Sequence, residues 1–466
     1  MTARGILSYG AYLPYRRLDR SEIRAVAGTG GGSGTRTVAS YDEDTTTLGV
    51  AAARRALADA PAGVSPGSLW FSTVTPAYVD KTNATAVHAA LRLDDGVAAF
   101  DANGAVRSAV GILRVALASG PPALVVAADV RTGRPGSSDE ADGGDGASAL
   151  LVGSADDGPL VAEVLGTAGV TEEFLDRWRV PGETHSRLWE ERFGEGRYSA
   201  LGARAWDDGL KDAGLVADQV DTVVIVASHT RAPTSLARKL GVGDKLAAGL
   251  DAAVGFTGAA HPGLALADAL DRAEPGAVVA LVVLADGADV VVFRATEALA
   301  AVRRPEAGVA AQAAAGAPVA YGKVLAWRGY LPVEPPRRPE PARPSGSAAG
   351  RTRSWKFGFV GSEDDDGTVH LPPAPGDDRD RPMADARGTI VTFTVDRLAY
   401  SPSPPVIFAV VDFDGGGRLP VELTDVDEGD VAIGDRVEMS FRKLFTADGI
   451  HNYFWKARPV RADEGR

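Results

Sequence analysis

The 466-residue chain contains no cysteine. Without cysteine there is no thiolate to act as a nucleophile and no thiolate to bind a metal ion. Any chemistry must therefore use other side chains, or the function rests on binding alone. The absence of cysteine is also compatible with a cytoplasmic protein.

Positive charge and long apolar runs are scarce as well. The chain carries 49 Lys and Arg against 62 Asp and Glu, a net charge of −13 at pH 7, and such a field repels nucleic acids and anionic lipids. No apolar run reaches the roughly 20 residues of a membrane span. Residues 1–14 lack the basic and apolar segments of a signal peptide. We therefore expect a cytoplasmic protein with neither a nucleic-acid nor a membrane partner.

Hydrophobic residues make up 45% of the chain, which is enough for large buried cores. Up to about residue 300, apolar runs of the buried-strand type alternate with stretches of helical composition. The runs cover residues 123–128, 222–227 and 278–284, and the helical stretches cover 45–60, 105–118 and 262–272. This order predicts a layered α/β fold with mainly buried sheets.

A short motif occurs twice. Asp145-Gly146-Ala147 and Asp286-Gly287-Ala288 each follow an apolar strand by a short loop, and each leads into another apolar run. Together with the shared order of strands and helices, this repetition favours an internal duplication of one α/β unit.

The composition changes after Arg303. Residues 332–344 are rich in proline, which predicts an extended, semi-rigid connector, and residues 345–350 are expected to be looser. Residues 362–386 are polar and acidic. The β-type patterns within residues 388–459, such as 389–395 and 437–441, indicate about five strands and predict a small barrel.

Specific segments carry a family resemblance. Residues 5–14, residues 42–48 and the Asp145-Gly146-Ala147 motif resemble 3-hydroxy-3-methylglutaryl-CoA synthase of the archaeal and bacterial type. That enzyme belongs to the thiolase superfamily, as do the ketoacyl synthases of type III. The C-terminal segments resemble the zinc-ribbon and OB-fold partner protein of archaeal thiolases, on residues 388–395, 411–418, 437–442 and 452–456. The two units are fused here in one chain.

The resemblance implies an α/β fold, a thiolase-like five-layer αβαβα sandwich followed by a C-terminal OB-fold β-barrel. We expect thiolase-like halves at 1–155 and 156–300, a linker at 301–345, a degenerate zinc ribbon at 346–387 and the barrel at 388–466. The resemblance also implies a homodimer that needs no cofactor. Its implied ligand is a small acyl or polyketide group, carried as a thioester on CoA or on a carrier protein.

The nucleophile of the family is missing. The family places its cysteine at the N-terminus of a buried helix, and the ungapped match puts Val106 there; a slip of one residue gives Ala105. Neither side chain can form an acyl-enzyme. Ser108 is the nearest hydroxyl, but it lies about 200° further round a helix, so packing is its simpler role.

Two further catalytic positions are apolar. Val74 matches the family's acid–base glutamate, and Phe256 matches its asparagine. Tyr78 and Asp80, on the same loop as Val74, are polar candidates for catalysis, or they form an ordinary loop hydrogen bond. His261 follows Phe256 and is a candidate for the pocket.

His229 is the one retained catalytic residue type. It follows the apolar run 222–227, where the resemblance places the catalytic histidine. A neutral imidazole in that position can move a proton near neutral pH. The alternative is a histidine that caps the end of the strand.

The metal site is altered too. Where the resemblance expects Cys-x-x-Cys, the chain has Glu363-Asp364-Asp365-Asp366, and the second cysteine pair is absent. Carboxylates with one histidine bind a hard cation weakly, and a solvated acidic loop is the alternative. We therefore expect no zinc site.

These replacements suggest a repurposed thiolase-fold enzyme of biosynthesis or secondary metabolism. It would perform non-covalent carbon–carbon bond chemistry, as a lyase or a cyclase: aldol or retro-aldol cleavage, cyclisation or pericyclic closure. Thiolase-like aldolases of steroid side-chain degradation resemble this case, since they also lack the cysteine. The alternative is a non-catalytic subunit that binds or scaffolds acyl groups. An open pocket favours the enzyme, and a pocket filled by Phe256 and Arg107 favours the scaffold.

Overall fold

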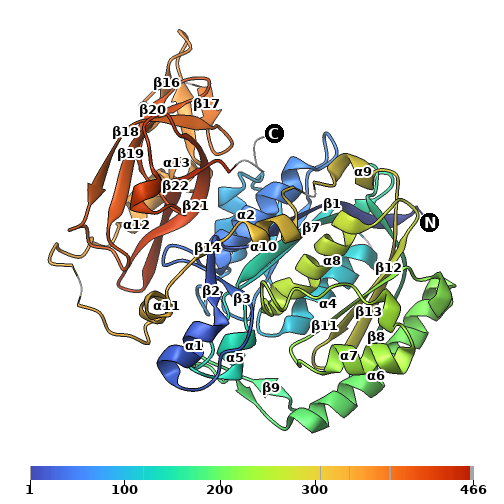
Figure 1. The fold of residues 1–466 in the computed structure, drawn as a ribbon. Helices are drawn as coiled ribbons and strands as arrows, with labels where there is room; N and C mark the ends of the chain where they lie inside the picture. The colour runs from blue at the N-terminus through green and yellow to red at the C-terminus, as the bar shows by residue number, and fades with distance from the viewer. Residues whose placement is uncertain (1, 119, 305, 335, 377–378, 462–466) are drawn as a thin grey trace.

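The structure, a computed structural model, describes residues 2–118, 120–304, 306–334, 336–376 and 379–461. Its main body is a continuous nine-stranded sheet with the order β11-β12-β13-β8-β1-β7-β6-β4-β5 (Figure 1). The N-terminal half supplies β1 (Arg4–Tyr12), β4 (Ser68–Ser72), β5 (Ala98–Asp101), β6 (Ala123–Asp129) and β7 (Gly146–Ser154). The C-terminal half supplies β8 (Ala162–Val170), β11 (Thr222–Ala227), β12 (Val278–Leu284) and β13 (Ala288–Ala295).

The two halves share one strand order. In the N-terminal half it is β5-β4-β6-β7-β1, and in the C-terminal half β11-β12-β13-β8 repeats the last four places. An isolated parallel bridge between Val223 and Leu246 stands where the fifth strand of the second half would lie. The halves meet at β1 and β8, where Ile6 pairs with Ala162.

Helices cover both faces of each half-sheet. In the N-terminal half these are α2 (Thr45–Ala58), α3 (Ala84–Ala90) and α4 (Val106–Ala118), and in the C-terminal half α6 (Glu191–Ala213), α7 (Ala232–Leu240) and α8 (His261–Arg272). Asp44 sets the start of α2, because its carboxylate accepts a hydrogen bond from the Thr47 amide in a capping box. α2, α4 and α8 lie close to the predicted helical stretches 45–60, 105–118 and 262–272, whereas α3, α6 and α7 had no predicted bounds.

Alternate residues of the strands separate the layers. Leu124 and Val126 of β6 pack with α2, whereas Val125 packs with α4 and α8. In β12, Leu281 faces the same α4 and α8 layer, and Val282 packs with α6 and α7. The layers therefore run α, β, α, β, α, and the predicted thiolase-like sandwich is confirmed.

The C-terminal barrel is confirmed as well. It has five antiparallel strands in the order β20-β19-β18-β21-β22. A bridge from Leu423 to Ala457 draws the end of β20 towards β22. The strands are β18 (Gly388–Asp396), β19 (Val406–Phe413), β20 (Arg418–Glu422), β21 (Arg436–Ala447) and β22 (Ile450–Pro459). Gly415, Gly416 and Gly417, all at positive φ, make the turn between β19 and β20.

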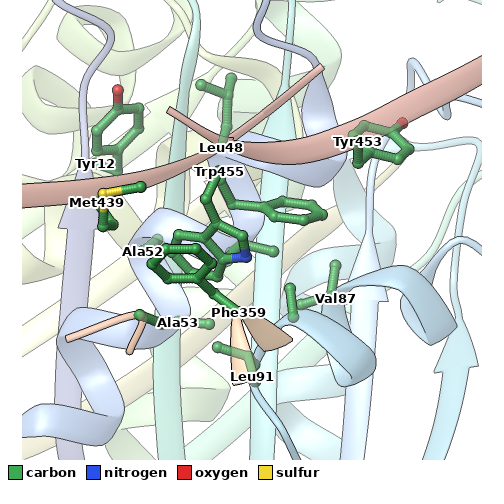
Figure 2. Close-up of a cluster of buried hydrophobic side chains, with 14 of the residues drawn as sticks. Tyr12, Leu48, Ala52, Ala53, Val87, Leu91, Phe359, Met439, Tyr453 and Trp455 are labelled. Carbon is green, nitrogen blue, oxygen red and sulfur yellow. The ribbon is translucent and has the colours of Figure 1, made fainter. Parts of the chain in front are cut away.

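One apolar core joins the barrel to the main body. Trp455 and Phe359 are directed towards residues of α2 and α3, such as Ala52 and Val87, and all of them are buried (Figure 2). The indole Nε1 of Trp455 donates to the Phe357 carbonyl oxygen at 2.7 Å. Because this core is shared, the barrel is docked on the α2 side of the sandwich (Figure 1).

The segment between the two domains is not extended throughout. It contains α9 (Leu299–Val302), α10 (Val309–Ala314), β14 (Ala317–Pro318) and α11 (Tyr321–Trp327). β14 joins β2 (Arg16–Asp19) and β3 (Thr35–Val38) in a small sheet. Tyr321 of α11 is buried, and its hydroxyl donates to Glu140 at 2.9 Å. These contacts bind the first part of the predicted linker to the main body.

The proline-rich part of the segment, unlike the part before it, has no regular secondary structure. Residues 328–334 and 336–345 contain no helix or strand, as a run of prolines predicts. The loose stretch expected at 345–350 is instead helical: α12 (Gly346–Arg351) starts at Ser345, whose hydroxyl accepts from the Ala348 amide, and α13 (Arg353–Gly358) follows. The remaining small elements are α1 (Arg20–Ala27), α5 (Ser138–Asp142), β9 (Arg177–Trp178) and β10 (Arg187–Leu188).

The segment predicted to be a degenerate zinc ribbon, residues 346–387, contains a three-stranded sheet. Its strands are β15 (Val360–Glu363), β16 (Val369–His370) and β17 (Arg379–Pro382). The Asp364 carboxylate lies 3.1 Å from Nε2 of His370. In the described part of the chain, no three His, Asp or Glu side chains are grouped so that they could hold a metal ion.

We expect less than about 0.1 zinc per chain in purified protein, because a tetrahedral zinc site needs four strong ligands and this segment offers no thiolate. Elemental analysis by inductively coupled plasma mass spectrometry, before and after dialysis against EDTA, measures this ratio. About one EDTA-resistant zinc per chain would contradict the expectation.

Among the described residues, no helix combines the length and the apolar composition that crossing a membrane requires.

Candidate functional site

Two of the three apolar replacements, Val74 and Val106, meet at one cavity. Val106 is the first residue of α4, and Val74 lies on the loop after β4; both line a cavity of about 560 Å³ together with Ala105. The opposite wall comes from residues 177–183, from Tyr198 of α6 and from the loop between β12 and β13. The structure thus brings together Val106 and Val74, the two positions predicted to match the nucleophile and the glutamate of the family.

A buried carboxylate fixes the wall of this cavity. Asp129, the last residue of β6, accepts hydrogen bonds from the Val74 amide at 2.7 Å, the Thr73 hydroxyl at 2.7 Å and the Ala259 amide at 2.6 Å. Burial raises the pKa of Asp129, and the positive charge of Arg131 together with these hydrogen bonds offsets part of that rise. A Cβ at Gly258 would lie 2.0 Å from the Asp129 carboxylate, so only glycine fits there.

A second cavity of about 340 Å³ adjoins the first. The two share Arg131, Arg177 and Ser228 in their walls. The second cavity is also lined by His229 and Phe256. Phe256 therefore borders the adjoining cavity and does not fill the one lined by Val106.

His229 is held by the backbone through both ring nitrogens. Nε2 lies 2.7 Å from the Glu191 carbonyl oxygen, and Nδ1 lies 3.2 Å from the amide nitrogen of Ala232. The neutral tautomer with its proton on Nε2 satisfies both contacts. The side chain is 7% exposed. His229 therefore lines a cavity and caps the first turn of α7 at the same time.

The other predicted polar candidates lie elsewhere. The Tyr78 hydroxyl accepts a hydrogen bond from the His451 amide at 2.8 Å, beside the barrel, and lines a separate cavity of about 1020 Å³. Asp80 is exposed, and Ser108 is half-buried on α4. Neither lines the cavities of Val106 and His229. Val79, between them on the same loop, does line the cavity of Val106, so Tyr78 and Asp80 are close to the site in sequence but are not part of its wall.

His261 is buried beside Phe256, at a ring-centroid distance of 5.0 Å. Its Nδ1 accepts from the Thr257 amide at 3.2 Å, and desolvation lowers its pKa. It is a neutral packing residue next to the second cavity, whose wall it does not join.

The structure adds polar residues that sequence reasoning missed. Tyr198 lines the first cavity, and its hydroxyl donates to Asp176 at 3.1 Å. Asp286 lines the same cavity, and its backbone has a positive φ of 48°. Burial and the negative charge of Asp176 raise the pKa of Asp286, and the positive charge of Arg107 offsets part of that rise. The sequence could have pointed to Asp286, because it is the first residue of the second Asp-Gly-Ala motif. Tyr198 and Arg131 had no such signal, since ordinary helix and loop composition surrounds them.

Comparisons with known proteins give matches for both parts of the chain. Residues 380–442 match the family described as "ChsH2, C-terminal OB-fold domain". The hydroxymethylglutaryl-CoA synthase of Methanopyrus kandleri is 30% identical over 318 residues, which cover 64% of this chain and 89% of that protein. The synthase of Pyrococcus horikoshii is 29% identical over 283 residues, 58% of this chain and 80% of that protein.

Solved structures agree on the fold. A crystal structure of HMG-CoA synthase complexed with CoA aligns at a TM-score of 0.59 and 16% identity, over 69% of this chain and 89% of that chain. The HMG synthase of the curacin biosynthetic pathway, in complex with acetyl donor-ACP, aligns at a TM-score of 0.58 and 17% identity. The alignment covers 70% of this chain and 88% of that chain. At these identities the likeness shows the fold alone.

Proposed function

Because this chain belongs to the hydroxymethylglutaryl-CoA synthase family, we propose that it binds an acyl thioester and makes or breaks a carbon–carbon bond without a covalent acyl-enzyme. Aldol or retro-aldol chemistry is the first candidate, and cyclisation or pericyclic closure of a polyketide-type intermediate is the second. A non-catalytic acyl-binding subunit of a biosynthetic complex is the alternative.

The unfilled cavity at Val74 and Val106 is the observation that carries the proposal. Its volume of about 560 Å³ is in the range of small-molecule sites. Arg107, which follows Val106, is turned away: its Nε is 2.7 Å from Asp289 and its Nη1 is 2.7 Å from the Asp286 carbonyl oxygen. Neither Arg107 nor Phe256 blocks the cavity, and this supports an enzyme over a scaffold.

A retro-aldol step balances with side chains alone. A base takes the proton of the 3-hydroxyl group, the bond between C2 and C3 breaks, and its electron pair moves into the thioester enolate. The enolate then takes a proton at C2, and C3 leaves as a carbonyl. His229 and Asp286 are the proposed proton-transfer groups, since each lines one of the adjoining cavities.

Solved neighbours suggest what carries the acyl group, and the edge of the sheet suggests how two copies of the chain associate. The solved neighbours are complexed with CoA and with a donor acyl carrier protein, so we propose that the acyl group arrives on one of these in the cytoplasm. β5 ends the nine-stranded sheet, and Phe100 on it is 46% exposed. An apolar sheet edge of this kind pairs readily with a second copy, which supports a homodimer.

We expect acyl-CoA thioesters to bind without covalent attachment, since Val106 and Ala105 carry no nucleophile. Native mass spectrometry with 3-hydroxyacyl-CoA should show a complex that disappears under denaturing conditions, and liquid chromatography–mass spectrometry should show the cleaved products. Binding without products would favour the acyl-binding subunit. A stable acyl adduct on the denatured chain would refute the non-covalent chemistry.

A further inference from the structure

The cavity that Tyr78 lines lies where the main body, the connector and the barrel meet, and we call it the junction cavity. Its volume is about 1020 Å³. Apolar surface from α3, β5, α12, α13 and β22 forms much of its wall, through Ala86, Ala89, Ala99, Ala349, Phe357 and Tyr453. Val79 lines the cavity of Val106, whereas the adjacent Tyr78 lines the junction cavity. The loop after β4 therefore separates the two cavities, and the junction cavity is a site of its own.

The uncharged polar groups of this wall are bonded to the protein itself. The Tyr78 hydroxyl accepts from the His451 amide at 2.8 Å, and the Tyr453 hydroxyl donates to Asp44 at 2.8 Å. The side-chain amide of Asn83 donates to the Tyr78 carbonyl oxygen at 2.9 Å. Because these groups already have partners, the wall offers mainly apolar surface to an occupant.

Four cationic side chains line the junction cavity, and three of them have opposite charges nearby. The carboxylate of Asp101 acts on Lys81. Arg343 and Arg353 form ion pairs with exposed carboxylates, at 3.8 and 3.3 Å. The fourth is Lys356 of α13, which is half-buried. Lys356 is therefore the cation whose surroundings decide which charge the cavity accepts.

The ammonium of Lys356 has no polar partner within the described part of the chain: it makes no hydrogen bond and no ion pair there. Burial alone lowers the pKa of Lys356, and no carboxylate acts to raise it again. Its Nζ lies 5.8 Å from the centroid of the Phe357 ring, a partial cation–π contact. An ammonium held partly out of water loses hydration, and a carboxylate beside it would offset that loss through a charge-assisted hydrogen bond.

We propose that the junction cavity binds a medium- or long-chain monocarboxylic acid, with its chain along the apolar wall and its carboxylate at Lys356. A large, mainly apolar cavity with few polar groups to fix orientation is the usual form of a small-molecule site. The apolar wall matches the chain of such an acid, and one cation without a polar partner matches one negative charge. A phosphorylated ligand would need more than one such cation. This site goes beyond the proposed thioester function and does not depend on it.

Isothermal titration calorimetry near neutral pH with decanoic acid and decan-1-ol tests the proposal, because the two ligands have chains of equal length and differ in charge. We expect decanoate to bind about tenfold or more tightly, the usual scale for a hydrogen bond between charged groups. Lys356→Gln should abolish this preference and leave the affinity for decan-1-ol within about twofold. Lys239→Gln, at an exposed lysine of α7, should keep the preference. Hexanoate should bind about 100-fold or more weakly than decanoate, because each buried methylene contributes about fourfold.

Ala89→Trp, which places an indole in the junction cavity, should weaken the binding of decanoate and decan-1-ol by about tenfold or more. Retained melting temperatures show that the variants are folded. Equal binding of the two ligands by the unsubstituted protein would refute the role of Lys356. Binding that Ala89→Trp leaves unchanged would place the ligand elsewhere and refute the site. If neither ligand binds, the proposal is wrong, and a lower mass of the Ala89→Trp assembly in multi-angle light scattering would then show that a second copy covers the cavity.

Discussion

Replacing Arg442 by methionine is expected to lower the free energy of unfolding by about 3 to 5 kcal/mol. Arg442 lies on β21 of the barrel and is 1% exposed. Its Nη1 is 2.6 Å from Glu43, and its Nη2 donates to Asp425 at 2.6 Å and to the Tyr12 hydroxyl at 3.0 Å. Methionine would leave two carboxylates buried without their cation.

The ion cluster around Arg442 lies across the junction of the two domains. Lys456 of β22 is also fully buried and lies 3.1 Å from Asp42 and 2.7 Å from Glu422. Asp42 and Glu43 come from the loop that precedes α2 in the main body. Burial, against the attraction of Arg442, raises the pKa of Glu43 to about 7, so part of the negative charge is removed near neutral pH.

Arg436→Met is the matched control for Arg442→Met. Arg436 lies on the same strand, but its ion pair with Asp414 is exposed on both sides. Exposed ion pairs contribute about 0 to 1 kcal/mol to stability, so the free energy of unfolding of this variant should be close to that of the unsubstituted protein. Urea denaturation followed by tryptophan fluorescence measures both. A loss below about 1 kcal/mol for Arg442→Met would show that the cluster relaxes or admits water.

The layered fold could be predicted because its strands are unambiguous in sequence. β11 and β12 have the predicted bounds of 222–227 and 278–284, since strands buried on both faces are continuous apolar runs. The connector could be predicted only in part. α11 is only seven residues long, and its position depends on distant partners, such as Glu140 for Tyr321, which no local pattern reveals.

The candidate site was predictable where it follows the family pattern. Val74 and Val106 were predicted to occupy the family's glutamate and cysteine positions, and the structure places both on one cavity. Arg131 and Tyr198 were not predictable, because the burial of both side chains at a cavity is a property of the assembled structure. Tyr78 shows the reverse case: it is close to Val74 in sequence, but its hydroxyl accepts a hydrogen bond from the barrel residue His451.

His229→Asn is expected to lower the rate of retro-aldol cleavage of a 3-hydroxyacyl thioester by about 100-fold, the scale for loss of a general acid or base. Asparagine keeps an acceptor where Nδ1 accepts from the Ala232 amide, so the first turn of α7 stays capped. It removes the group that can move a proton. The melting temperature should therefore stay close to that of the unsubstituted protein while turnover of a 3-hydroxyacyl-CoA falls.

His229→Ala separates the two roles of this residue. Alanine removes both the imidazole and the cap, so it should lower turnover as much as asparagine does and also cost about 0.5 to 2 kcal/mol of stability. If asparagine retains turnover and alanine loses it, the cap is what matters, and His229 only positions α7. Proton transfer would then belong to another cavity residue, with Asp286 first, because it lines the cavity of Val106.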